Sequence, residues 1–182
     1  MNEIIKIKTP LTDSTIESLH AGCQVEITGT IFTARDMAHK RLCDALDADQ
    51  PLPIDLKGAV FYFLGPTPAK PSAVIGSAGP TTSSRMDPFS PKLIQAGLKG
   101  MIGKGYRNLV VRQALKQFKA VHFAAIGGAG ALLSKHIKES RIIAYPDLGP
   151  EAIRKLHVVD FPAVVAYDCL GHSVYNVDKM IR

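Results

Sequence analysis

Short apolar runs that end in glycine-rich turns occur three times in the middle of this chain. The runs end in "GSAGP", "IGKG" and "IGGAG", and segments with helical spacing of apolar residues lie between them. Strands that alternate with helices in this way favour an α/β fold with a partly parallel sheet. In such sheets, the groups that bind ligands collect at the carboxyl ends of the strands. The three turns are therefore the first candidate positions for a functional site.

Strand and helix signals alternate along nearly the whole chain. Buried strands are bounded by glycine, and Pro150 suits the first position of a helix. The length of 182 residues fits a single domain over 1–182. The main predicted strands are 24–32, 58–65, 72–80 and 99–105, the main predicted helices are 33–49, 107–118 and 149–157, and a strand, glycine turn and helix are predicted over 120–137.

Composition and charge exclude several classes of protein. The chain is 46% hydrophobic and 21% charged, which is ordinary for a folded globular protein. Its formal net charge is +6, but Lys and Arg are spread along the sequence and only 7% of residues are aromatic. Nucleic-acid-binding proteins concentrate basic residues and interleave them with aromatic ones. We therefore expect no nucleic-acid partner, and the positive charge favours a small anion or an acidic partner protein.

The sequence shows no targeting segment and no paired cysteines. No apolar run approaches the ~18 residues of a membrane span, and the first residues lack the pattern of a signal peptide. We therefore expect a cytoplasmic protein without a membrane partner. Cys23, Cys43 and Cys169 are far apart and form no CxxC pair, so no metal site within this chain is expected.

The stretch "AGPTTSSRMD" places four hydroxyl residues directly after a Gly-Pro turn. If the backbone amides of Thr81, Thr82, Ser83 and Ser84 lack strand or helix partners, these amides and the hydroxyls form a cradle for an anion. Arg85 adds a planar guanidinium that can bind a carboxylate through two parallel hydrogen bonds. The alternative is a helix cap rich in serine and threonine with a surface arginine.

Two further motifs carry cations. In "TARDMAHKR", Arg35 and His39 are four residues apart and share one helix face near its N-terminus, where the helix dipole favours anions. Arg35 could hold a carboxylate while His39 transfers a proton or orients a neighbour; the alternative is an exposed helix surface. In "IGKGYR", Lys104 lies between two glycines, which let backbone approach a ligand closely. Together these motifs indicate a site for a small carboxylate or phosphate.

The same motifs resemble the β subunit, or C-terminal domain, of the iron–sulfur-dependent hydro-lyases, which are the class I fumarases and L-tartrate dehydratases. The similar segments run in family order from about Thr28 to Asp168. They are "TGTIFTARDMAHKRL", "GPTPAKPSAVIGSAGPTTSSRMDPF", "GKGYR", "FAAIGGAGALLSKHIK" and "DLGPEAIRKLHVVDFPAVVAYD".

This resemblance implies a fold and a partner. The fold would be a three-layer β/β/α swivelling domain with a mixed, partly parallel sheet. The active site would lie at the interface with an α subunit, which holds a 4Fe-4S cluster through three cysteines and leaves one iron open to substrate. This chain lacks such cysteines and would bind no cluster alone, so it would be inactive without its partner. The assembly would be a heterotetramer, or would contain a homodimer of β chains.

The resemblance also implies roles for individual residues. Arg35 and Arg85 would hold the substrate carboxylates, and Lys104 would be a further substrate-binding cation. Thr81 would take part in proton transfer at the substrate carbon, and His39 would be catalytic or would support Arg35. The remaining substrate-binding residues that the resemblance implies are Thr82, Ser83 and Ser84.

The implied reaction is the reversible hydration of fumarate to (S)-malate, as in the tricarboxylic acid cycle. The segments "IGGAGALL" and "YPDLGPEAI" favour this choice. One alternative is an L(+)-tartrate dehydratase, or the dehydratase of a related 2-hydroxy diacid. An alternative of another class is a module that binds a small anion and acts alone.

Overall fold

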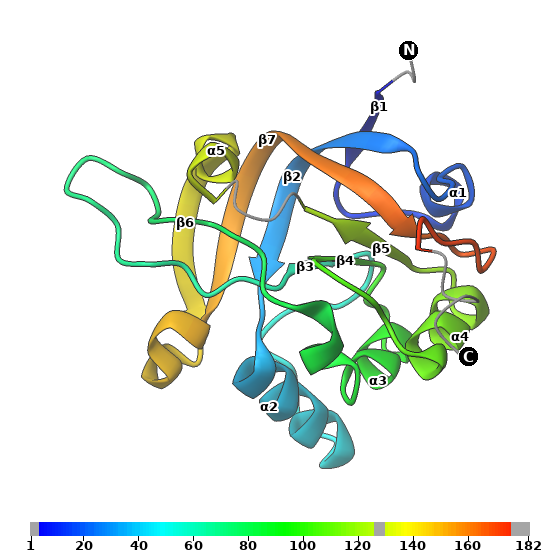
Figure 1. Cartoon of the computed structure of the whole chain (residues 1–182). Coiled ribbons are helices and arrows are strands. Elements are labelled where there is room, and N and C mark those ends of the chain that lie inside the picture. Colours follow the sequence, from blue (N-terminus) through cyan, green and yellow to red (C-terminus); the bar gives the residue numbers. More distant parts are fainter. Residues whose placement is uncertain (1–3, 126–129, 176–182) are drawn as a thin grey trace.

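Strands and helices alternate in the computed structural model, which describes residues 4–125 and 130–175 (Figure 1). The strands are β1 (Ile5–Lys8), β2 (Gln24–Thr33), β3 (Val60–Tyr62), β4 (Gly100–Gly103), β5 (Val121–Ala124), β6 (Ile137–Ala144) and β7 (Ile153–Tyr167). The α-helices are α1 (Asp13–Glu17), α2 (Asp36–Asp47), α3 (Ser90–Gln95), α4 (Leu109–Gln117) and α5 (Gly130–Leu133), and the 3-10 helices are η1 (Ser83–Met86), η2 (Ser134–His136) and η3 (Pro146–Glu151).

The seven strands join in one mixed sheet in the order β1-β2-β3-β4-β5-β7-β6. Strands β1 to β5 pair in parallel, whereas β7 runs antiparallel to β2, β5 and β6. The additional pairing of β2 with β7 bends the sheet back on itself, so that two layers of strands face each other. The predicted α/β fold with a mixed, partly parallel sheet is confirmed.

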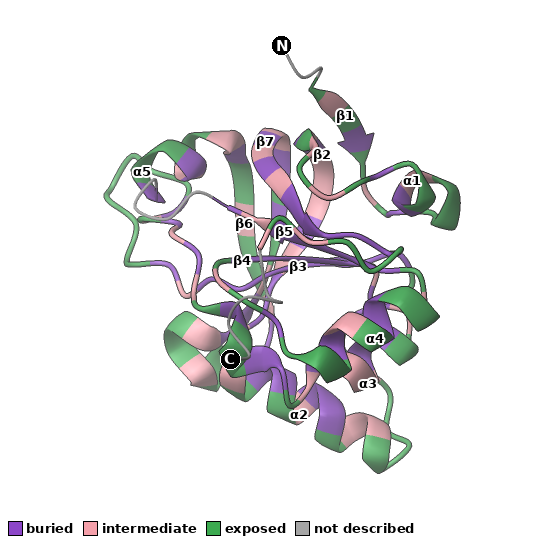
Figure 2. Cartoon of the chain, turned by 45° about the vertical axis from the view of Figure 1, so that its right-hand side comes forward, coloured by how far each residue is buried: buried purple, intermediate pink, exposed green. Residues whose placement is uncertain are grey.

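Two apolar cores separate three layers. One core lies between the two layers of strands and contains, for example, Ile31, Phe123 and Leu156. The other lies between the parallel strands and helices α2, α3 and α4, and contains Leu42 and Leu115. Figure 2 shows the buried residues of these helices along the side that faces the sheet. The arrangement is strand layer, strand layer and helix layer, as the resemblance implied.

Two predicted elements are absent from the described residues. The segment 72–80 is not a strand, because β2 and β4 already occupy both edges of β3. It forms the returning part of a loop that projects from the body at the left of Figure 1, and it contains both exposed residues, such as Val74, and buried ones, such as Ile75 and Ala78. The predicted helix 149–157 is a 3-10 turn followed by β7, because pairing with β2 and β6 overrides the local helix signal. The predicted glycine turn at Gly127 and Gly128 lies outside the described residues.

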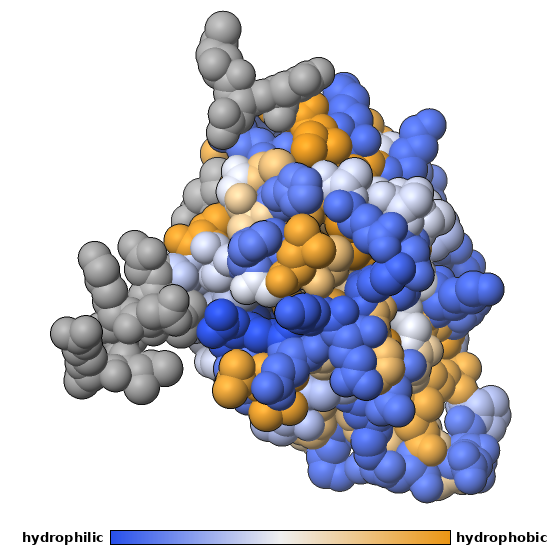
Figure 3. All heavy atoms as spheres, turned by 90° about the vertical axis from the view of Figure 1, so that its right-hand side faces the viewer, coloured by the Kyte–Doolittle hydropathy of each residue, from blue (hydrophilic) through white to orange (hydrophobic). Residues whose placement is uncertain are grey.

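The face of the molecule at the right of Figure 1 is mostly polar. Figure 3 shows hydrophilic residues over most of the face at the right of Figure 1, with small apolar patches between them. Among the described residues, no helix is both long enough and apolar enough to cross a membrane.

Candidate functional site

Arg35 lies where β2 passes into α2, between the last strand residue, Thr33, and the first helical residue, Asp36. Its side chain is only 20% exposed, and its Nη2 lies 3.6 Å from Asp36 Oδ2 and 3.5 Å from Glu151 Oε1. A Cβ atom on Gly65 would lie 2.7 Å from Nη1 of Arg35, so glycine is needed there for this arginine to pack as it does. The guanidinium is therefore held between two carboxylates at the start of α2.

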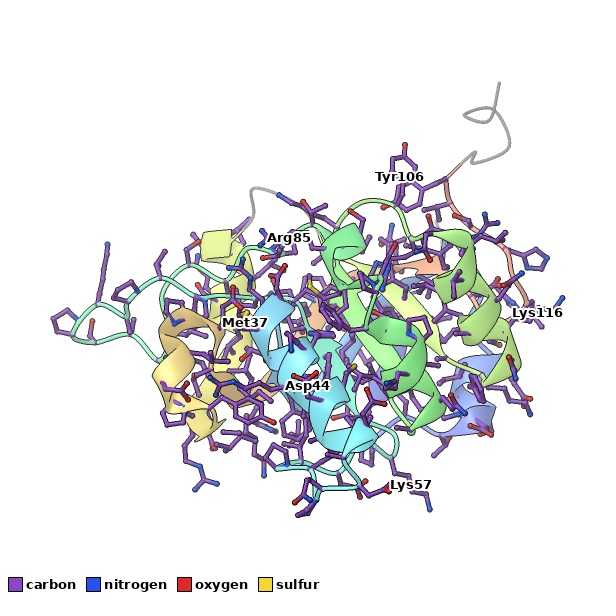
Figure 4. The ribbon with its side chains drawn as sticks, turned by 90° about the horizontal axis from the view of Figure 1, so that it is seen from below. Met37, Asp44, Lys57, Arg85, Tyr106 and Lys116 are labelled. Atoms are coloured by element: carbon purple, nitrogen blue, oxygen red, sulfur yellow. The ribbon has the colours of Figure 1, made fainter. Side chains whose placement is uncertain are left out.

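Arg85 reaches the same carboxylate from a different segment. The 3-10 turn η1 carries Arg85, whose Nε donates a hydrogen bond of 2.9 Å to Asp36 Oδ1. Figure 4 shows Arg85 toward the end of α2 that carries Met37, with Tyr106 toward the same edge of the molecule and Lys57 at the opposite edge. The structure thus brings Arg35 and Arg85, which are 50 residues apart in sequence, to the carboxylate of Asp36.

Lys104 is joined to the same turn through the backbone. Thr82 and Lys104 form a parallel bridge, and the Ser83 amide donates a hydrogen bond of 2.8 Å to the Lys104 carbonyl. A Cβ atom on Gly103 would lie 2.2 Å from Ser83 Oγ. Gly103 is therefore needed for Ser83 to pack, whereas a Cβ atom on Gly105 would meet nothing within 4 Å. Lys104 itself is exposed, on the strand exit beside the turn that carries Arg85.

The four hydroxyl residues divide into buried and exposed members. Thr81 is half-buried, and its amide donates a hydrogen bond of 2.7 Å to the Phe63 carbonyl. Ser83 is fully buried, with its Oγ 3.2 Å from His122 Nε2. The predicted row of four free amides is therefore wrong, and so is the substrate-binding hydroxyl of Ser83, because neighbouring segments take up these groups. The exposed members are Thr82 and Ser84.

His39 lies in the core rather than on the surface of α2. Its ring centroid is 5.6 Å from that of Phe61 and 5.3 Å from that of Phe63, and Phe89 packs nearby. Nδ1 donates a hydrogen bond of 2.9 Å to the Arg35 carbonyl. Burial lowers the pKa of His39 to about 4, so the ring is neutral at pH 7. Of the two predicted roles, support of Arg35 fits this geometry and direct proton transfer to a substrate does not.

Several polar residues near the site were not predicted from the sequence. Glu151 accepts a hydrogen bond of 3.0 Å from the Met37 amide and so caps α2 from 114 residues away. Arg107 lies behind η1 with a fully buried side chain, in an ion pair of 2.6 Å with Asp87. His122 is also fully buried. A polar residue in an apolar strand, such as His122 in "AVHFAA", is a sequence signal for buried hydrogen bonding, whereas nothing local marks Glu151.

The cysteines do not form a metal site. Cys43 and Cys169 are buried and Cys23 is half-buried, and burial raises the pKa of the Cys43 thiol to about 11. Among residues 4–125 and 130–175, no three His, Cys, Asp or Glu side chains come close enough together to hold a metal ion. The described residues therefore do not fit an iron–sulfur cluster bound by this chain.

Two hollows on the surface do not include the cations of the site. A hollow of about 520 Å³ is lined by residues of β2, β6 and β7, and another of about 260 Å³ is lined by the projecting loop with Pro150 and Arg154. Neither is lined by Arg35, Arg85 or Lys104. These residues can hold an anion by charge and hydrogen bonding, but neither hollow encloses it.

Comparison with known proteins identifies the family. The family described as "Fumarase C-terminus" matches residues 1–177. The chain belongs to this family. Fumarate hydratase 2 of Leishmania major is 37% identical over 158 residues, which are 85% of this chain and 28% of that protein. The aerobic class I fumarate hydratase of Escherichia coli strain K12 is 36% identical over 155 residues, which are 84% of this chain and 28% of that protein.

A relative of similar length is named for a subunit. A protein of Methanocaldococcus jannaschii, named for the beta subunit of L(+)-tartrate dehydratase, is 36% identical over 178 residues. The match covers 94% of this chain and 91% of that protein. The fumarase-family chain thus spans little more than a quarter of these two fumarate hydratases and nearly the whole of this subunit. The family resemblance drawn from the sequence is confirmed.

Proposed function

We propose that this chain is the β subunit of a hydro-lyase that reversibly hydrates fumarate to (S)-malate. The observation that carries the proposal is the approach of Arg35 and Arg85 to one carboxylate, Asp36, beside the strand exit that carries Lys104. Cations gathered in this way suit a dicarboxylate substrate. The relationship to class I fumarate hydratases supports the reaction.

The two arginines retain donors for a substrate carboxylate. Asp36 binds Arg85 through Nε, and no hydrogen bond or ion pair within residues 4–125 and 130–175 involves the two Nη nitrogens of Arg85. Both ion pairs of Arg35 use Nη2, and no hydrogen bond or ion pair among these residues involves its Nη1. Removal of a proton next to a carboxylate increases the negative charge on that carboxylate in the transition state. Fixed guanidinium groups stabilise this charge more than they stabilise the ground state.

Thr81 is the proposed proton-transfer group of this chain. The hydrogen bond from its amide to the Phe63 carbonyl fixes the backbone of Thr81 beside the end of β3. Its half-buried side chain therefore projects from a fixed position. A threonine hydroxyl is a weak base, so Thr81 would relay the proton to an acceptor on the partner. Lys104, Thr82 and Ser84 lie on the same exposed segments and would bind the second carboxylate.

A cluster-bearing α subunit is the proposed partner. Two observations support it: the related β subunit, and the exposure of Arg85 and Lys104 on the surface of this chain. Beyond Lys104, the side chains of Tyr106, Leu109 and Val110 are 46%, 62% and 57% exposed. Large apolar side chains at this exposure suit burial by a partner. The partner's 4Fe-4S cluster would act as a Lewis acid toward the hydroxyl group that leaves.

An L(+)-tartrate dehydratase is the second candidate. The match at 36% identity over 91% of the related β subunit favours it. Both substrates are 2-hydroxy dicarboxylates and would use the same arginines. The ratio of kcat/KM for (S)-malate to that for L-tartrate distinguishes the two.

The proposal is tested with the chain assembled with its partner under anaerobic conditions. We expect no activity from the purified chain and turnover of (S)-malate by the assembly, followed through the absorbance of fumarate. Arg35→Ala and Arg85→Ala should each remove about 2–5 kcal/mol of transition-state stabilisation, which is a fall in kcat/KM of about 30-fold to several thousand-fold.

Arg41→Ala is the matched control. Arg41 lies on the same helix as the site and pairs with Asp147 on the surface, so its loss should leave kcat/KM close to that of the wild type. Wild-type kcat/KM in either site variant would refute the site. Absence of hydro-lyase activity from the wild-type assembly on either diacid would refute the proposed reaction.

A further inference from the structure

A buried charged network lies directly behind the turn that carries Arg85. The Arg107 side chain is 0% exposed. Its Nε donates a hydrogen bond of 2.6 Å to Asp87 Oδ1, and its Nη2 donates one of 2.6 Å to Ser90 Oγ. Its guanidinium lies over the Phe63 ring, 5.4 Å from the centroid. A fully buried arginine is costly to desolvate, and in some proteins such pairs serve to fix one conformation rather than to add stability.

Asp87 connects this arginine to two helices. It follows η1 directly, and its second oxygen accepts a hydrogen bond of 2.8 Å from the Asn108 amide, at the start of α4. The Arg107 amide in turn donates a hydrogen bond of 3.1 Å to the Tyr167 hydroxyl. Arg107 and Asp87 therefore link the end of η1 to the start of α4.

His122 extends the network to Ser83, at the other end of η1. A guanidinium can only donate, so Arg107 Nη1 donates to His122 Nδ1 across 3.3 Å. Burial and the charge of Arg107 hold the pKa of His122 well below its usual range, so the ring is neutral. Its one hydrogen is then on Nε2, which donates to Ser83 Oγ across 3.2 Å. Arg107 thus selects the histidine tautomer that holds Ser83.

We infer that Arg107 is a positioning residue that holds both ends of η1 and thereby fixes Arg85 and the Ser83–Lys104 pairing at the substrate site. The inference rests on the proposed function for its catalytic consequence. The contacts of Arg107 are at Asp87 and, through His122, at Ser83, and the residues between them carry Arg85. None of the described contacts brings Arg107 itself to the surface where substrate would bind.

Amide hydrogen exchange of the full chain, measured by NMR, tests the positioning without activity. The variants are Arg107→Lys, which keeps the charge and loses the planar group, and His122→Phe, which keeps a ring and loses both nitrogen contacts. We expect exchange at the Ser83 amide, which bonds to the Lys104 carbonyl, to become at least about tenfold faster. Exchange at the Val165 amide, which bonds to the Cys23 carbonyl ahead of β2, should change less than about twofold.

Arg112→Met is the matched control. Arg112 is on α4, with its guanidinium 5.9 Å from the centroid of the Tyr167 ring, and no hydrogen bond or ion pair in the described residues joins its side chain to η1. It should leave exchange at Ser83 unchanged. Equal acceleration at Ser83 and Val165 in the Arg107 and His122 variants would overturn the inference, because it would show a general loss of stability.

The catalytic consequence is measured in the assembled enzyme. We expect Arg107→Lys and His122→Phe to lower kcat at least about tenfold, and Arg112→Met to leave kcat unchanged. Faster exchange at Ser83 with wild-type kcat and KM would refute the catalytic role and leave the proposed function intact. A wild-type assembly without hydro-lyase activity would refute the proposed function, whereas the exchange result would still stand for the local structure.

Discussion

His39 gives a test of whether the histidine in the "TARDMAHKR" motif is a core residue. Its ring is packed among Phe61, Phe63 and Phe89, and only Nδ1 has a hydrogen-bond partner among the described residues. Replacement by phenylalanine keeps an aromatic ring in this space and removes the titrating group. At pH 7 we expect His39→Phe to change the free energy of unfolding by no more than about 1 kcal/mol, the value of the lost hydrogen bond.

At acid pH we expect His39→Phe and the wild type to differ in their free energy of unfolding. The pKa of His39 is lowered from 6.5 to about 4 on folding, because burial disfavours the charged ring. Between these values the unfolded chain binds a proton at this residue and the folded chain does not, so stability rises with pH across the window and falls on acidification. At pH 4 the wild type should have lost about 3 kcal/mol of stability through this residue alone.

Urea denaturation, followed by circular dichroism from pH 7.5 to pH 4, measures this difference. The loss of unfolding free energy over that range should be about 3 kcal/mol smaller in His39→Phe than in the wild type. His20→Asn is the control: it removes an exposed histidine and should follow the wild-type curve. Parallel curves for wild type and His39→Phe would refute the buried, neutral histidine and would restore a solvent-accessible proton-transfer role.

Two further predictions follow from close contacts. Gly65→Ala places a methyl group 2.7 Å from the guanidinium of Arg35, so kcat/KM of the assembled enzyme should fall about 10- to 100-fold. In the control Arg41→Ala, kcat/KM should stay near that of the wild type. Unchanged turnover by Gly65→Ala would show that Arg35 does not need its present position. Asp168 is buried and accepts hydrogen bonds from the amides of Ala21 and Leu170. Asp168→Ala should therefore lower the free energy of unfolding, measured in urea, by about 1–3 kcal/mol. A smaller loss would show that these amides find other partners.

Sequence reasoning predicted the elements whose local signals agree with the fold. The strand at "GMIG" and the helix of "LVVRQALKQ" occur where periodicity and glycine boundaries placed them. The segment 72–80 failed because strand formation needs a free neighbouring edge, and β3 has none. The helix predicted at 149–157 failed because strands far away in sequence pair with Ile153–Tyr167. Both errors arise from tertiary pairing, which a local pattern does not contain.

In the candidate site, too, local motifs identified some residues, whereas others are brought there only by tertiary pairing. The candidate carboxylate-binding residues could be identified from local motifs, because Arg35 follows a predicted strand and Arg85 follows a row of hydroxyl residues. Of the two carboxylates that hold Arg35, Glu151 could not be predicted, since it is remote in sequence and lies beside Arg35 through the pairing of β7 with β2. The burial of Ser83 also depends on His122, which lies on β5. Sequence therefore identified the cations and missed the groups that orient them.

Strand β7 has a consequence for how the protein is made. Its fifteen residues pair with β2, β5 and β6, and its partner Gln24 lies 140 residues before Val164. Contacts between such remote segments slow folding, because a long loop must close before they form. While the ribosome is still adding the residues of β7, the apolar inner faces of β2 and β5 have no cover, and the nascent chain is most exposed to aggregation at that stage.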